Sequence, residues 1–104
     1  NKSIIFYNKK NYRNKNAVID RFKKKFKVIG ISNFKEIDSY KDKFFIEYIY
    51  VQKSGKKDNW VSKKIKTLVH CVYPQKLNQV HGNKYVYISE WLSENFSNKK
   101  IPFI

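Results

Sequence analysis

The sequence predicts an α/β fold in which helices flank a parallel sheet. Short apolar runs typical of buried strands occur at residues 3–7, 28–31, 65–72 and 85–88. Helical segments follow several of these runs, and neighbouring parallel strands need such crossover connections. The chain has 104 residues, 41% of them apolar, which is the size of one domain with one core. We therefore expect a single domain, residues 1–104, with a four-stranded parallel sheet, three helices and an inserted hairpin between the second and third strands.

A helix is expected after the first strand, over residues 16–26. Asn16 is a suitable N-cap, and the lysines near the end of the segment favour the negative end of the helix dipole. Apolar side chains recur at helical spacing, which predicts a buried face. These side chains are Val18, Ile19, Phe22 and Phe26. The strand at residues 28–31 follows directly and completes a β-α-β unit.

The inserted hairpin is expected within residues 32–64. Residues 44–51 are rich in aromatic and β-branched side chains, which is typical of a strand. Trp60 and Val61 can return as its partner strand. Residues 53–59 combine a glycine with several charges, so we expect a turn or mobile loop that packs poorly.

The C-terminal part repeats the alternation of strand and helix. After the strand at residues 65–72, Pro74 can open a short helix, and Gly82 can end it in a left-handed conformation. The strand at residues 85–88 is followed by Ser89, a good cap for the last helix.

This C-terminal part resembles a BRCT repeat. Residues 82–91, Gly-Asn-Lys-Tyr-Val-Tyr-Ile-Ser-Glu-Trp, resemble the family's glycine turn, apolar strand, cap and tryptophan. Residues 66–69, Lys-Thr-Leu-Val, resemble its Thr-His-Leu-Val strand with leucine in place of histidine, and residues 98–101 resemble the turn after its last helix. The front half departs, because the family's Gly-Gly turn is missing and residues 32–64 are longer than usual. The resemblance implies a non-catalytic interaction domain of a nuclear DNA repair, replication or checkpoint protein.

Two residues are expected to serve the core. A tryptophan on the inward face of a last helix fills a large gap, so Trp91 is predicted to be a structural anchor. Cys71 lies in an apolar stretch and is predicted to be a small buried side chain.

The resemblance also implies a phosphate site. BRCT domains that bind phosphoserine or phosphothreonine use a small hydroxyl residue with a glycine just after the first strand, and a lysine near the start of the second helix. Lys76 matches that lysine approximately. Asn8 and Lys9 occupy the first location, where the Ser/Thr-Gly pair is absent, although an asparagine amide and a backbone N–H can hold a phosphate oxygen. Asn8, Lys9 and Lys76 are therefore the expected phosphate-binding residues.

The strong positive charge leaves DNA binding open as an alternative. Lysine and arginine number 23 against 8 aspartate and glutamate, which gives a net charge of +15. A polyanionic partner fits this charge. The alternative is compositional: the chain is rich in residues with adenine- and thymine-rich codons, lysine among them, so part of the charge can reflect this bias on an ordinary solvated surface. Lysines contact phosphates without reading sequence, so such binding would be non-specific and salt-sensitive. The expected contacts are Lys23, Lys24, Lys25, Lys27, Lys63 and Lys64.

The sequence contains no recognisable motif for catalysis, cofactor binding or metal binding. There is no phosphate-cradling glycine loop, paired-carboxylate motif or nucleophile with a recognisable base. Cys71, His70 and His81 offer no CxxC or HExxH spacing for zinc. No apolar run reaches the roughly 18 residues that span a bilayer. We expect a phosphorylated or unmodified protein partner or, alternatively, DNA. We expect no cofactor and no membrane partner. Whether a neighbouring BRCT repeat is present in the parent protein is left open by the sequence.

Overall fold

A computed structural model describes residues 3–104 and has two parallel sheets within them. The strands are β1 (Ile4–Asn8), β2 (Lys27–Ile31), β3 (Tyr48–Lys53), β4 (Lys66–Cys71) and β5 (Lys84–Tyr87). The helices are α1 (Asn16–Lys23), α2 (Glu36–Ser39), α3 (Lys41–Phe44), the 3-10 turn η1 (Leu77–Gln79) and α4 (Glu90–Ser97). Strand β1 pairs with β2, and the second sheet has the order β3-β4-β5. The predicted α/β class with parallel strands is confirmed.

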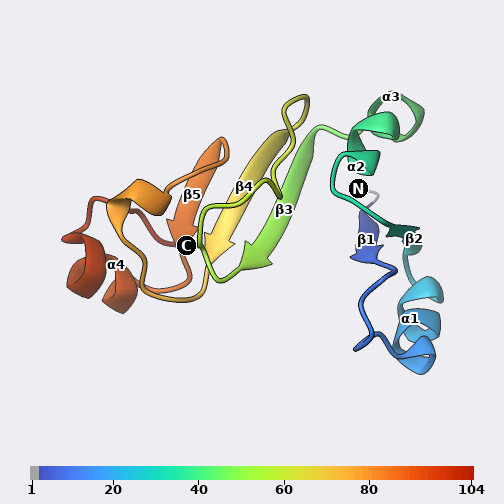
Figure 1. Cartoon of the computed structure of the whole chain (residues 1–104), viewed down its shortest axis with the longest axis horizontal. Helices are drawn as coiled ribbons and strands as arrows, with labels where there is room; N and C mark the ends of the chain where they lie inside the picture. The colour runs from blue at the N-terminus through green and yellow to red at the C-terminus, as the bar shows by residue number, and fades with distance from the viewer. Residues whose placement is uncertain (1–2) are drawn as a thin grey trace.

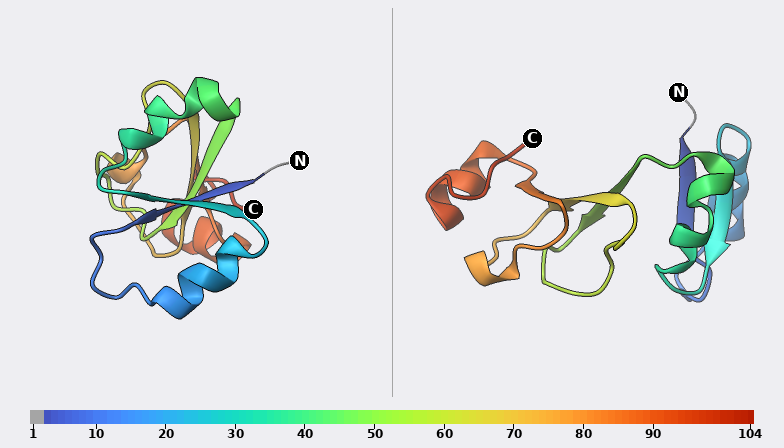
Figure 2. Two further views of the ribbon diagram at one scale, coloured as in Figure 1. Left: turned by 90° about the vertical axis from the view of Figure 1, so that its right-hand side faces the viewer. Right: turned by 90° about the horizontal axis from the view of Figure 1, so that it is seen from above.

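The two sheets lie toward opposite ends of an elongated molecule (Figure 1). In the end-on view of Figure 2, β1 and β2 cross the direction of β3. The Cα radius of gyration is 15.0 Å, compared with about 13 Å for a compact chain of 100 residues. The strands of the described residues therefore do not form the one four-stranded sheet that the sequence suggested.

The predicted hairpin between the second and third strands is wrong. Strand β3 does form, but it pairs in parallel with β4, with Ile49 opposite Thr67. Trp60 and Val61 lie in no strand. The ring of Trp60 packs edge-on against Phe34 at a centroid distance of 5.5 Å. Packing of this partly buried ring, together with hydrogen bonds of the Trp60 backbone to Lys53 and Asp58, holds the segment without strand pairing.

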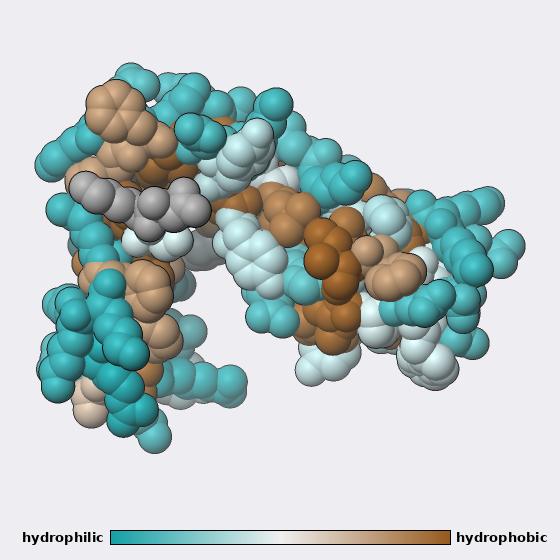
Figure 3. Space-filling model, turned by 180° about the vertical axis from the view of Figure 1, so that it is seen from behind, coloured by the Kyte–Doolittle hydropathy of each residue, from teal (hydrophilic) through white to brown (hydrophobic). Residues whose placement is uncertain are grey.

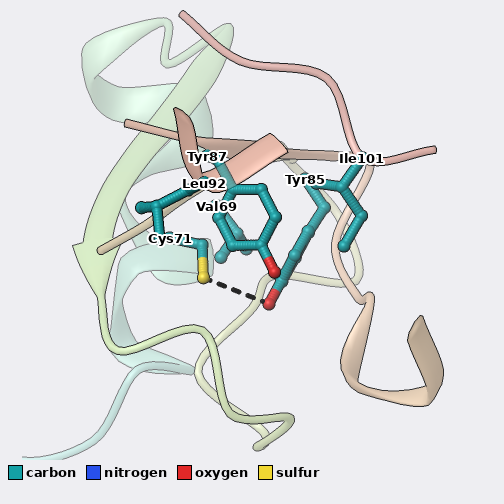
Figure 4. Close-up of a cluster of buried hydrophobic side chains, with 6 residues drawn as sticks. All are labelled: Val69, Cys71, Tyr85, Tyr87, Leu92 and Ile101. Atoms are coloured by element: carbon teal, nitrogen blue, oxygen red, sulfur yellow. Dashed lines mark hydrogen bonds between the residues drawn. The ribbon is translucent and has the colours of Figure 1, made fainter. Parts of the chain in front are cut away.

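The first hydrophobic core lies on one face of the three-stranded sheet (Figure 4). Alternate residues of a strand share a face, which is why Val69 and Cys71 of β4 and Tyr85 and Tyr87 of β5 meet there. The core is completed by Leu92 of α4 and by Ile101. Cys71 is 0% exposed, so its predicted burial is confirmed.

A second core joins the two sheets. Its buried members include Ile31 at the end of β2 and Ile65 directly before β4. Ile49 of β3 packs against it. Close to this core, the Ser62 hydroxyl donates a hydrogen bond to the Asp38 carboxylate. Residues from both ends of the molecule therefore share one hydrophobic cluster.

Helix α1 forms but does not pack as predicted. Lys15 is the N-cap and makes no side-chain cap bond, so the cap predicted for Asn16 is wrong. The expected buried face is also wrong, because no residue of α1 is buried and Val18 and Phe22 are 43% and 45% exposed. The adjoining sheet has only β1 and β2, which offers the helix a narrow surface.

Trp91 is 62% exposed, so its prediction as the core anchor is wrong. Successive positions of an α-helix turn by about 100°, and α4 directs Leu92 and Ser93 inward instead. The Trp91 ring lies edge-on to Phe96 at 5.5 Å. Ser89 caps α4 as predicted, by accepting a hydrogen bond from Leu92 N. Gly82 has the predicted left-handed φ of 80°, but it does not end the short helix and Pro74 does not open it, because η1 spans Leu77–Gln79.

Candidate functional site

A surface pocket of about 490 Å³ opens between the segments that follow β3 and β4. Lys56 comes from the first segment, Lys76 comes from the second, and Phe96 of α4 forms a further wall. Both segments begin at the carboxyl ends of parallel strands. Open α/β sheets bind ligands beyond these strand ends. The pocket therefore lies where the fold favours a binding site.

The lining of the pocket suits an anion. Its other lining residues are Pro74, Gln75 and Gln79, so no carboxylate lines it. Both lysine side chains belong to exposed residues and are free to turn toward a ligand. A lysine ammonium group binds phosphate as a compact charge with three donors. Lys56 and Lys76 are the two cationic residues among those that line the pocket.

Hydrogen bonds tie the two pocket segments together. Gln75 Nε2 donates to Ser54 O at 3.2 Å, and the Lys57 backbone N–H donates to Gln79 Oε1 at 2.8 Å. The poor packing predicted for residues 53–59 is therefore wrong for this part of the segment. These bonds fix the backbone from which Lys56 extends.

Gly55 anchors the segment after β3 to the core. It is buried with a φ of 100°, and its carbonyl accepts a hydrogen bond from Tyr85 Oη at 2.7 Å. Burial, together with the Cys71 thiol beside it, raises the pKa of the Tyr85 hydroxyl, so this hydroxyl remains a donor. The Cys71 thiol itself donates to Ser54 O at 3.2 Å and is fully buried. Cys71 is thus a structural residue and not an accessible nucleophile.

Asp58 holds the later part of the same segment through hydrogen bonds. Its Oδ1 accepts hydrogen bonds from Lys53 Nζ at 2.6 Å and from the Trp60 N–H at 2.9 Å. Partial burial alone would raise the pKa of the Asp58 carboxyl, but these bonds and the charges of Lys53 and His81 outweigh burial and lower it. Asp58 is therefore a carboxylate at neutral pH.

The predicted phosphate-binding residues do not meet. Lys76 lines the pocket, whereas Asn8 and Lys9 lie at the end of β1, in the other sheet, and line no part of it. The side chain of Asn8 is used locally, since its Oδ1 accepts from the Lys10 N–H at 3.0 Å. Lys9 N–H is bonded to Ile31 O. Asn8 and Lys9 are therefore not partners of Lys76.

Sequence reasoning missed the pair Ser54-Gly55, which directly follows β3. It is a small hydroxyl residue with a glycine, the type of pair that the BRCT resemblance implies after the first strand. The sequence instead predicts a mobile loop at this pair, because it places β3 in an inserted hairpin and not in the sheet that precedes Lys76.

The lysines expected to contact nucleic acid are exposed but divided between two places. The first group lies at the end of α1 and the start of β2, where Lys27 Nζ sits 4.6 Å from the centre of the Phe44 ring. Lys63 and Lys64 lie in the segment before β4. Figure 3 shows hydrophilic side chains over both ends of the molecule and an apolar band between them. The other members of the first group are Lys23, Lys24 and Lys25.

Among residues 3–104, no group of three or more histidine, cysteine, aspartate or glutamate side chains could hold a metal ion. No helix in that range is long and apolar enough to cross a bilayer. Comparisons with protein-family models, with curated proteins and with solved structures yielded no match.

Proposed function

We propose that this chain is a BRCT-type recognition domain that binds a phosphorylated serine or threonine of a partner protein between Lys56 and Lys76. The pocket carries the proposal. Two lysines reach it from segments that follow neighbouring parallel strands, and no carboxylate lines it. A phosphate group placed there gains charge-assisted hydrogen bonds from both ammonium groups.

The sequence resemblance supports the same site. Ser54-Gly55 follows β3 and Lys76 directly precedes η1, which resembles the residue types that phosphate-binding BRCT domains use, although the family's pair follows its first strand and neither Ser54 nor Gly55 lines the pocket. In this proposal β3, β4 and β5 carry the family's site. The chain departs from the family between β3 and β4, where residues 54–65 contain no helix.

The proposed activity is recognition without catalysis. It requires no cofactor, because the lysine ammonium groups supply the charge. On the same resemblance we propose that the parent protein acts in nuclear DNA repair, replication or checkpoint signalling.

The test compares a phosphoserine peptide with its unphosphorylated twin by calorimetry at two salt concentrations. Lys76→Ala and Lys56→Ala should each weaken binding of the phosphorylated peptide by about 10- to 150-fold, the equivalent of roughly 1.5 to 3 kcal/mol for a hydrogen bond to a charged group. Lys23→Ala, which removes the same charge from exposed α1, should leave the preference unchanged. Equal binding of both peptides by the unaltered protein would refute the proposal.

A second candidate is DNA binding through the lysines near the end of α1. The observation in its favour is that residues 21–27 are all exposed and include Arg21, Lys23, Lys24, Lys25 and Lys27. Phosphate contacts by such a cluster need no pocket.

A further inference from the structure

His81 is a buried histidine beside the proposed phosphate site. It lies between η1 and β5, and its side chain is 5% exposed. Its ring packs against the ring of Tyr85 at a centroid distance of 5.5 Å. The function proposed above gives this side chain no role, and a buried titratable group next to a binding site calls for an explanation.

The hydrogen bond of one ring nitrogen fixes the state of the other. Nδ1 of His81 lies 2.6 Å from the carbonyl oxygen of Gln79. A carbonyl only accepts hydrogen bonds, so Nδ1 carries the proton. In the neutral ring, Nε2 then has a lone pair and no hydrogen. This Nε2 is buried and makes no hydrogen bond within residues 3–104.

A carboxylate oxygen lies close to that nitrogen. Nε2 of His81 lies 3.8 Å from Oδ1 of Asp58. While the ring is neutral, a lone pair faces a negative oxygen, and no hydrogen bond can form between them. A proton on Nε2 turns the same contact into an attraction between opposite charges, at a distance of 3.8 Å that is longer than a hydrogen bond.

We propose that His81 is a proton-controlled positioning residue of the phosphate site, which fastens the segment after β3 to the turn before β5 when its Nε2 is protonated. This proposal rests on the proposed function. The contact between protonated His81 and Asp58 would join two segments that both line the pocket. Lys56 lies two residues before Asp58, and Gln79 bonds to both His81 and the Lys57 N–H. Protonation therefore adds a contact to the hydrogen bonds that already join these two sides of the pocket near Lys56.

The other charged groups around His81 do not remove this dependence. Lys53 of β3 binds the same Asp58 oxygen at 2.6 Å and disfavours a second positive charge, whereas Asp58, whose Oδ1 lies 3.8 Å from Nε2, favours it. Tyr85 of β5 stays neutral because burial raises the pKa of its hydroxyl. Because proton uptake and phosphate binding favour the same arrangement, each must strengthen the other.

The test measures phosphoserine-peptide affinity at pH 7.5 and pH 6.0. His81→Asn keeps an amide donor for Gln79 O but cannot take up a proton. His70→Asn is the matched control, since His70 also has a buried Nε2 without a partner and bonds through Nδ1 to Tyr50 Oη. Each variant is compared with the unaltered protein, so that the phosphate's own protonation near pH 6 cancels.

On lowering the pH, the unaltered protein and His70→Asn should gain at least about fivefold in affinity relative to His81→Asn, the lower end of typical coupling between linked sites. Asp58→Asn should lose the same gain, and combining it with His81→Asn should change nothing further. An identical pH dependence in all variants would overturn the proposed role of His81 while leaving the proposed phosphate site intact. If the protein does not prefer the phosphorylated peptide at either pH, the proposed phosphate site is overturned, and the proposed role of His81 with it.

Discussion

At the scale of single residues, Gly55 shows how one backbone position can organise a site. An added Cβ there would lie 2.0 Å from Cys71 Sγ and 2.7 Å from Tyr85 Oη. Its φ of 100° is also unfavourable for any residue with a side chain. Only glycine lets the segment after β3 run this closely over the core, and Lys56 of the pocket is the next residue.

Gly55→Ala should therefore destabilise the protein and disturb the pocket. Strain at such a φ costs about 1 to 3 kcal/mol, and displacement of two buried side chains adds to it. Urea denaturation followed by circular dichroism measures the change. Gly30→Ala is the control, because its φ is ordinary and its closest contact, at 3.0 Å, is the Tyr7 hydroxyl at the end of a side chain. Equal stability losses in the two variants would contradict this account.

The sequence predicted residues well where the signal is local. Ser89 acts within a few positions of the chain, and its capping role was correctly predicted, as was the left-handed φ of Gly82. Gly55 has equally strict requirements, but they come from Cys71 and Tyr85, which are 16 and 30 positions away along the printed sequence. A glycine among lysines therefore indicated flexibility, although tertiary contacts hold it.

At the scale of elements, strands were predicted more reliably than the surfaces that cover them. The apolar runs became β1, β2, β4 and β5 with shifts at their ends. The periodicity of α1 gave a helix, but the packing of its apolar face depends on how many strands lie beneath it, which no local pattern encodes. The same limit explains Trp91, because a cap and a tryptophan identify the helix without fixing its rotation.

Adjacent positions of α4 provide a direct test of that rotation. Leu92 is 7% exposed in the core of the three-stranded sheet, so Leu92→Ala should cost about 2 to 5 kcal/mol. Trp91→Ala should cost less than about 1 kcal/mol, because most of its side chain already contacts solvent. Thermal unfolding of the two variants checks the order. A larger loss for Trp91→Ala would restore tryptophan as the core anchor.

At the scale of the whole molecule, elongation separates the two basic surfaces. The phosphate pocket belongs to the three-stranded sheet, while the lysines after α1 belong to the other end of the chain (Figure 1). The net charge of +15 raises the affinity for any polyanion. Charge alone therefore cannot distinguish the two candidate functions. The positions of the lysines that bind the partner must distinguish them.

Replacing Lys23, Lys24 and Lys25 together by glutamine should act on DNA alone. If these exposed residues contact phosphates, the salt dependence of DNA affinity should flatten by about 0.9 in its logarithmic slope for each lost contact, equally for all sequences. Phosphopeptide preference should stay unchanged, because the pocket lies at the other sheet. The matched control replaces Lys84, Lys99 and Lys100, which removes the same charge from the opposite end of the chain. Fluorescence anisotropy at several salt concentrations measures both. Equal flattening in both triple variants would show that DNA responds to net charge and that α1 has no particular role, whereas an altered peptide preference in the α1 variant would show that the two surfaces act as one.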